Sequence, residues 1–158
     1  VVCTGLYNRW GYQKWSISYF TIVREKKIPV FVMFIDLDRL KYINDTFGHE
    51  YGDFAIVSIA KAMLKHCDAD AIAARTGGDE FIVLEGAKDE ESGRVLAQKI
   101  RTELSKTQRA MQLPFDLSAS IGVVVAHPGE ENVLESYVKR AEMLMYEEKA
   151  EKKVSRDS

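Results

Sequence analysis

The chain has few cysteines and no long apolar run, and both absences narrow the kind of protein it can be. Cys3 and Cys67 lie far apart, with neither a Cys-x-x-Cys spacing nor a nearby histidine pair, so neither a zinc site nor a disulfide framework is indicated. A reducing, cytoplasmic location fits this cysteine usage. The longest apolar run, residues 30–35, is far too short to span a bilayer, and we expect no membrane segment here.

An excess of charge of one sign is also lacking. The 22 Lys+Arg and 24 Asp+Glu residues interleave along the chain and leave a formal net charge of −2. A surface for nucleic acid needs concentrated positive charge, so we expect no nucleic-acid partner. Any phosphate group that the protein binds should therefore meet a local site.

The length and composition are typical of one globular domain. With 46% apolar residues over 158 positions, the chain can bury one core, and we interpret residues 1–158 as a single domain. Because it opens on Val1 and a helical pattern starts within a few residues, we expect it to be a piece of a longer protein. A membrane anchor upstream in that longer protein stays open.

Apolar periodicity and turn residues predict an ordered series of helices and strands. The expected elements are a helix over 8–27, a strand over 29–35, helices over 38–47 and 56–63, strands over 70–75 and 81–84, a helix over 96–104, a strand over 117–126 and a helix over 134–145. Between the two short strands, Gly77 and Gly78 predict a tight hairpin turn with positive φ angles. The strand-helix-strand-strand-helix-strand core predicts an α+β fold, a ferredoxin-like antiparallel sheet with helices on one face.

Two carboxylates stand where acidic residues are locally unexpected. Asp36 ends the apolar strand, and Asp79 lies at the tip of the Gly-Gly hairpin. If these strands are neighbours, the two anions converge and raise each other's pKa unless a cation lies between them. Oxygen ligands suit Mg²⁺ or Mn²⁺, which would neutralise triphosphate charge and activate an attacking hydroxyl. From the residues alone a plainer alternative stays open, in which Asp36 caps a helix and Asp79 is a turn residue.

Four motifs in a fixed order make the chain similar to a known family. Residues 75–84 read RTGGDEFIVL, residues 36–53 read DLDRLKYINDTFGHEYGD, and SIGV at 120–123 and AEMLMYEEK at 141–149 follow. Together they resemble the GGDEF domain family of diguanylate cyclases over nearly the whole chain. The resemblance implies a nucleotidyl cyclase-type sheet flanked by helices. It also implies a nucleotidyltransferase of bacterial signalling that condenses two GTP into cyclic di-GMP and two pyrophosphates.

The resemblance implies a role for each matching position. The implied ligands for Mg²⁺ or Mn²⁺ are Asp36, Asp79, Glu80 and the backbone carbonyl of Leu37. Glu80 is also a candidate for assisting deprotonation of the 3′-hydroxyl. The implied substrate-binding positions are Asn44 and Asp53 for guanine, Gly77 and Gly78 for close backbone approach, and Lys41, Lys149 and Lys153 for the phosphates.

Plainer alternatives accompany these roles. Asn44 can be a polar residue at a helix end, and Asp53 can favour the positive end of its helix dipole. Lys149 and Lys153 share a helix face at i,i+4, where like charges repel unless an anion joins them, and the charged run around them is equally typical of a solvated face.

The chain also departs from the family pattern at several places. The usual Asp-x-Leu-Thr opening reads Val1-Val2-Cys3-Thr4, and the Arg-x-x-Asp motif for product inhibition aligns with residues 68–71, which read DADA. In the last helix Glu142, Glu148 and Lys152 stand where the family prefers aspartate, alanine and glycine. These changes spare the implied metal ligands, but they are expected to affect the placement of Lys153 and to weaken product inhibition.

Activity would require a homodimer, because each subunit of this family holds one GTP and a half-site cannot close the ring alone. The resemblance also implies a sensor or receiver domain upstream. Two other functions stay open: a catalytically weak or inactive GTP-binding regulatory domain, and an interaction domain that has lost nucleotide binding.

Overall fold

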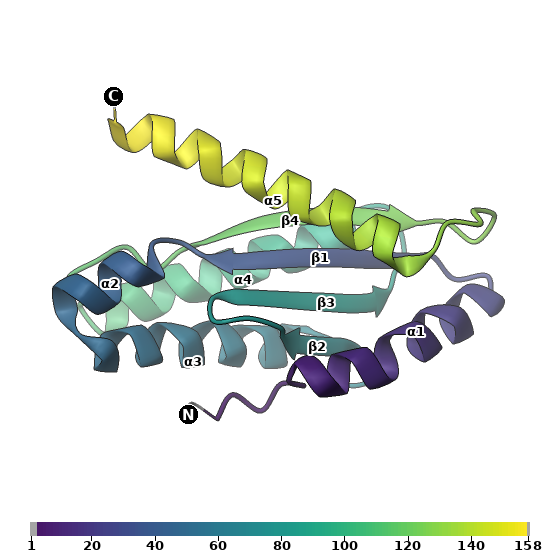
Figure 1. Ribbon diagram of the computed structural model, residues 1–158, viewed down its shortest axis with the longest axis horizontal. Coiled ribbons are helices and arrows are strands. Elements are labelled where there is room, and N and C mark those ends of the chain that lie inside the picture. The colour runs from purple at the N-terminus through teal and green to yellow at the C-terminus, as the bar shows by residue number, and fades with distance from the viewer. Residues whose placement is uncertain (1–2, 158) are drawn as a thin grey trace.

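The computed structural model, which describes residues 3–157, contains one four-stranded antiparallel sheet with helices on both faces (Figure 1). The elements are α1 (Arg9–Glu25), β1 (Val30–Leu37), α2 (Leu40–Phe47), α3 (His49–His66), β2 (Ile72–Arg75), β3 (Glu80–Gly86), α4 (Ser92–Ala110), β4 (Ala119–Ala126) and α5 (Leu134–Asp157). The strand order is β2-β3-β1-β4, and the predicted α+β fold is confirmed. Val1 and Val2 of the divergent opening lie outside the described residues. Within the described range, no helix is long and apolar enough to cross a membrane.

Local signals explain where the helices begin and turn. The side chain of Asn8 caps α1 by accepting a hydrogen bond from the Gly11 N–H at 2.9 Å. Gly48 separates α2 from α3 at a φ of 102°, a conformation that glycine adopts without strain. The chain therefore passes directly from one helix into the next, and α3 starts earlier than the expected 56–63.

The central strand β1 explains why helices cover both faces of the sheet rather than one. All eight of its residues are buried, because β3 and β4 pair with its two edges and helices cover its two faces. Phe31 and Met33 pack with residues of α3 and α4, whereas Val32 and Phe34 pack with residues of α1 and α5. The sequence predicted helices on one face of the sheet, which α3 and α4 cover. The second layer, formed by α1 and α5 on the other face, was not predicted.

The turn of the β2–β3 hairpin differs from the predicted tight turn. β2 ends at Arg75 and β3 begins at Glu80, so four residues separate the strands. Neither Gly77 nor Gly78 has a φ in the left-handed region, and the predicted positive φ angles are wrong. Hydrogen bonds close the turn instead. The Thr76 N–H donates to the Glu80 carbonyl at 3.0 Å, and the Arg75 guanidinium donates to the Gly78 carbonyl at 2.8 Å.

The last helix lies against β4 at backbone distance. A Cβ on Gly122 would stand 1.9 Å from the carbonyl oxygen of Ala141 and 2.7 Å from the nitrogen of Met145. Any side chain at this position would push α5 off the sheet. The glycine of the SIGV segment therefore sets the spacing between α5 and the sheet.

Candidate metal and nucleotide site

Three carboxylates converge at one end of β1 and β3. Asp36, Asp79 and Glu80 each offer an oxygen, and these oxygens lie within 4.8 Å of one another. Strand pairing places them there, because Asp36 is the register partner of Glu80 and the Leu37 N–H donates to the Asp79 carbonyl at 2.9 Å. The expected convergence of Asp36 and Asp79 is therefore present in the structure.

The cluster is partly sheltered from water, and its pKa shifts reflect this. Burial, countered by the hydrogen bond from Lys149 and assisted by Asp79 and Glu80, raises the pKa of Asp36 to about 6. Burial and the neighbouring Asp79 and Glu142 also raise the pKa of Glu80. Burial is the largest cause of both shifts, and the neighbouring carboxylates add to it, because each anion disfavours the charge of the next. Three oxygen donors with unbalanced negative charge are the chemistry that a hard divalent cation prefers.

Two neighbouring positions shape this cluster. A Cβ on Gly77 would lie 3.1 Å from Oε2 of Glu80, so glycine leaves room for that carboxylate. A Cβ on Gly78 would meet nothing within 4 Å, so the tip of the turn is open. The role of the Leu37 carbonyl as a further ligand stays a prediction.

The two residues expected to read guanine lie on adjacent helices. Asn44 belongs to α2 and is half-buried, whereas Asp53 belongs to α3 and is exposed. The side chain of Asn44 lies against the backbone of Gly52, the residue just before Asp53. The structure therefore brings both positions to the α2–α3 pair, and their role in guanine recognition stays a prediction.

The three lysines expected at the phosphates are placed differently. Lys149 of α5 donates a hydrogen bond to Asp36, with its side chain 34% exposed against 7% for the aspartate. Lys41 and Lys153 are exposed, and no ion pair involves either of them within residues 3–157. The structure therefore brings Lys149 alone of the three to the carboxylate cluster, and the phosphate role of all three stays a prediction.

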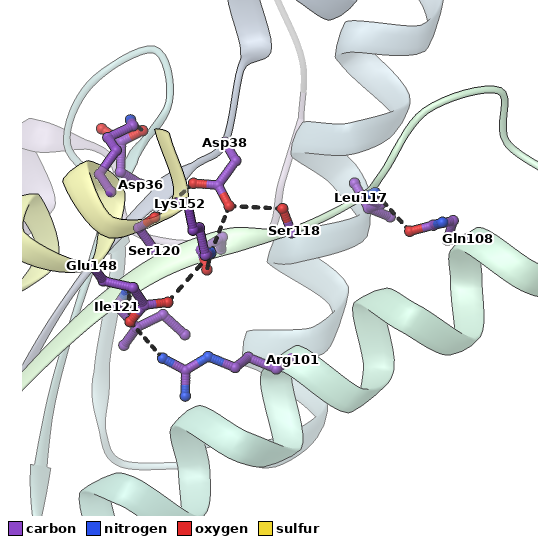
Figure 2. A network of polar contacts seen from close by, with 12 residues as sticks. Asp36, Asp38, Arg101, Gln108, Leu117, Ser118, Ser120, Ile121, Glu148 and Lys152 are labelled. Atoms are coloured by element: carbon purple, nitrogen blue, oxygen red, sulfur yellow. Dashed lines mark hydrogen bonds and ion pairs between the residues drawn. The ribbon is translucent and has the colours of Figure 1, made fainter. Parts of the chain in front are cut away.

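A second buried aspartate beside this cluster was missed by the sequence analysis. Asp38, whose side chain is 6% exposed, accepts hydrogen bonds of 2.7 Å from the hydroxyls of Ser118 and Ser120 and from Nζ of Lys152 (Figure 2). Burial raises the pKa of Asp38, but the hydrogen bonds from Lys152, Ser120 and Ser118 outweigh this effect and lower it. The alternation of Asp36 with Asp38, and of Ser118 with Ser120, was an available signal, because residues two apart share one face of a strand.

The chain is similar to known proteins over most of its length. The family described as "Diguanylate cyclase, GGDEF domain" matches residues 2–155. The diguanylate cyclase VdcA of Vibrio cholerae is 33% identical over 150 residues, and the diguanylate cyclase DgcP of Escherichia coli is 31% identical over 153 residues. These matches cover 92% and 94% of the chain but only 42% and 44% of the relatives. The chain therefore spans less than half the length of either relative.

The fold is also similar to that of solved structures. The GGDEF domain of DgcB from Caulobacter crescentus, solved in complex with c-di-GMP, superposes with a TM-score of 0.80 at 27% sequence identity. The superposition covers 93% of this chain and 87% of that one. By motif order, family match and fold, the chain belongs to the GGDEF domain family of diguanylate cyclases.

Proposed function

We propose that this domain is an active diguanylate cyclase half-site that binds one GTP together with Mg²⁺ or Mn²⁺. The observation that carries the proposal is the convergence of Asp36, Asp79 and Glu80 through the pairing of β1 with β3. A divalent ion held by these carboxylates would neutralise charge on the triphosphate. Asp36 and Asp79 hold it in this proposal, with Glu80 and the Leu37 carbonyl completing the ligand set.

Guanine recognition is assigned to Asn44 and Asp53. A carboxylate accepts hydrogen bonds from N1 and N2 of guanine, whereas adenine offers no matching pair of donors. The open tip of the hairpin at Gly78 gives the nucleotide access to the turn backbone. Lys149, which donates a hydrogen bond to Asp36, is assigned to contact the phosphates, and the exposed Lys41 and Lys153 are assigned to their outer oxygens.

Turnover requires two copies of the domain. Each 3′-hydroxyl attacks the α-phosphorus of the GTP on the partner. Each attack forms one phosphorus–oxygen bond, breaks the bond to the bridging oxygen and releases one pyrophosphate. Glu80 is assigned to take the hydroxyl proton. Positioning and charge neutralisation supply most of the rate enhancement.

The surroundings of the domain belong to the same proposal. Because VdcA and DgcP extend well beyond the matched region, we assign this chain to a larger bacterial signalling protein with an upstream sensor or receiver domain. The reaction is placed in the cytoplasm, where GTP is available.

One assay tests the proposal against its rivals. The purified protein is incubated with GTP and Mg²⁺, and the nucleotides are resolved and quantified. Cyclic di-GMP supports the cyclase, bound GTP without product supports a regulatory GTP-binding domain, and neither supports an interaction domain. The initial rate should rise with nearly the square of protein concentration while dimers are scarce. A strictly linear rate at concentrations where only monomer is present would contradict the two-copy mechanism.

The metal assignment has its own variants. Asp36→Ala and Asp79→Ala should abolish product formation and leave the fold largely intact, because neither side chain belongs to the apolar clusters. Glu147→Ala, which removes an exposed acid from α5, is the matched control and should retain activity. Both aspartate variants turning over GTP at the parent rate would refute the assignment.

A further inference from the structure

We propose that Glu148 and Lys152 of α5 act as an edge clamp on β4 that positions Lys149 against Asp36. The term edge clamp denotes these two side chains with their bonds to the sheet and to α4. The inference rests on the proposed function, because the placement of Lys149 affects catalysis only if the site binds nucleotide. Its structural part is independent of that function.

The clamp meets the free edge of the sheet. β4 is the last strand in the order, so its outward backbone groups have no strand partner. Nζ of Lys152 donates to the Ala119 carbonyl at 2.7 Å. The Ile121 N–H donates to Oε2 of Glu148 at 3.4 Å (Figure 2). One helix therefore satisfies both a carbonyl and an amide of the exposed strand edge.

The same two side chains also bind β1 and α4. Lys152 donates to Oδ2 of Asp38 at 2.7 Å, and Arg101 of α4 donates to Oε2 of Glu148 at 2.8 Å. Lys152 and Glu148 lie 3.3 Å apart. The charges alternate along the series Asp38, Lys152, Glu148 and Arg101, so each group has an opposite neighbour. Alternating, partly sheltered charges stabilise one another more than an isolated surface pair does.

Apolar packing does not hold this part of α5. The buried residues of the helix are Leu134, Tyr137, Ala141 and Met145, and no side chain from 146 to 157 is buried. Lys149 lies in this second segment. Its position relative to the sheet therefore depends on polar bonds, and the edge clamp supplies such bonds to β1, β4 and α4.

Geometry shows why the clamp sets the placement of Lys149. Lys149 binds Asp36 and Lys152 binds Asp38, so two lysines three positions apart on a helix meet two aspartates two positions apart along the chain. Three helical residues advance about 4.5 Å, and two extended residues advance about 6.6 Å. Long lysine side chains span the difference. The apolar residues up to Met145 fix the first part of the helix. Beyond them, two polar bonds at different points along the helix restrict its bending and twisting more than the Lys149–Asp36 bond alone.

A plainer alternative is that Glu148 and Lys152 form an ordinary i,i+4 pair that stabilises an exposed helix. That pair needs no bond to Ala119, Ile121, Asp38 or Arg101. Reversing the two charges separates the alternatives. Glu148→Lys with Lys152→Glu keeps a pair of opposite charges on the helix but places a cation at the Ile121 N–H and Arg101, and an anion at the Ala119 carbonyl and Asp38.

The test measures the affinity of the full chain for a non-hydrolysable GTP analogue with Mg²⁺ by calorimetry. Lys152→Ala, Glu148→Ala and the charge reversal should each weaken affinity at least about fivefold, because hydrogen bonds to charged groups are lost. The controls remove exposed charges from α5 that match the tested ones in sign: Glu147→Ala for Glu148 and Lys139→Ala for Lys152. Both controls should leave affinity unchanged. In a Lys149→Ala background, Lys152→Ala should have little further effect, because the clamp acts through Lys149.

Several results would overturn the inference. An affinity unchanged by the charge reversal would favour the simple helix pair. Additive losses from Lys149→Ala and Lys152→Ala would show that the clamp does not act through Lys149. If the unmodified protein binds no analogue, the proposed function fails, and amide exchange over 146–157 then tests the clamp alone. Faster exchange in the clamp variants than in the two controls supports it, and equal exchange refutes it.

Discussion

Oδ1 of Asn44 in α2 lies 1.7 Å from the point where a Cβ on Gly52 in α3 would stand. The two helices approach as they do because position 52 has no side chain. Alanine is the better helix former, so Gly52→Ala should favour α3 locally while displacing the Asn44 amide. If Asn44 reads guanine, the affinity for a GTP analogue should fall about tenfold, equivalent to about 1.4 kcal/mol.

Calorimetry with the analogue checks this expectation. Gly129→Ala is the control, because a Cβ at that position would meet nothing within 4 Å. Unchanged affinity in Gly52→Ala would remove Asn44 from the nucleotide site.

Asp53→Ser should loosen the preference for GTP over ATP, because it removes an acceptor that only guanine can satisfy. Asp53 is exposed, so water can replace part of the lost contact, and we expect a change of about tenfold rather than the larger factors of buried sites. Competition binding of the two nucleotides measures the ratio. Glu50→Ala removes a different acid, in the first turn of α3, and should preserve the ratio. An unchanged preference in Asp53→Ser would indicate that Asp53 only supports its helix.

Product inhibition through residues 68–71 should be weak. The Asp68 N–H donates to Oε1 of Glu85 at 2.7 Å. Burial raises the pKa of Glu85; this hydrogen bond counters the rise in part, and the charges of Asp68 and Asp70 add to it. Acidic groups at this place repel the phosphates of cyclic di-GMP. Asp68→Arg with Ala71→Asp should therefore tighten product binding by at least about tenfold. Calorimetry with the product measures both proteins, and tight binding by the unmodified chain that alanine substitutions here abolish would contradict the prediction.

The bond between Tyr137 and Glu130 should make stability depend on pH. The Tyr137 hydroxyl donates to Oε1 of Glu130 at 2.6 Å, and this bond, assisted by the His127 N–H, lowers the pKa of Glu130. A lowered pKa in the folded state stabilises the protein above the unfolded value of about 4.3, and that contribution is lost as pH falls through the folded value. Tyr137→Phe should therefore cost most stability near neutral pH and progressively less in acid.

Urea unfolding at several pH values between 7 and 3 measures the difference. Tyr146→Phe, an exposed tyrosine on the same helix, is the control and should show no such trend. A stability difference between Tyr137→Phe and the unmodified protein that stays constant down to pH 3 would show that the bond is not linked to the titration of Glu130.

Local patterns along the chain were enough to predict the elements and their order. The Asn8 cap, the apolar run of β1 and the helical spacing in α4 and α5 are properties of neighbouring residues, and the structure contains each expected helix and strand. The convergence of Asp36 with Asp79 was also predictable, because Asp36 lies near the end of β1, Asp79 directly precedes β3, and these two strands pair. The GGDEF motifs added the family, which the comparisons confirm.

Contacts between distant segments were decided only in three dimensions. Lys152 meets Asp38 and Lys149 meets Asp36 across more than a hundred residues of chain. Such pairings depend on strand register, on the rotation of α5 and on its spacing from β4 at Gly122. The hairpin turn was likewise misjudged, because hydrogen bonds from Arg75 and Thr76 rather than glycine φ angles close it. A side chain's local neighbours determine its helix or strand, whereas its polar partners depend on how whole elements pack.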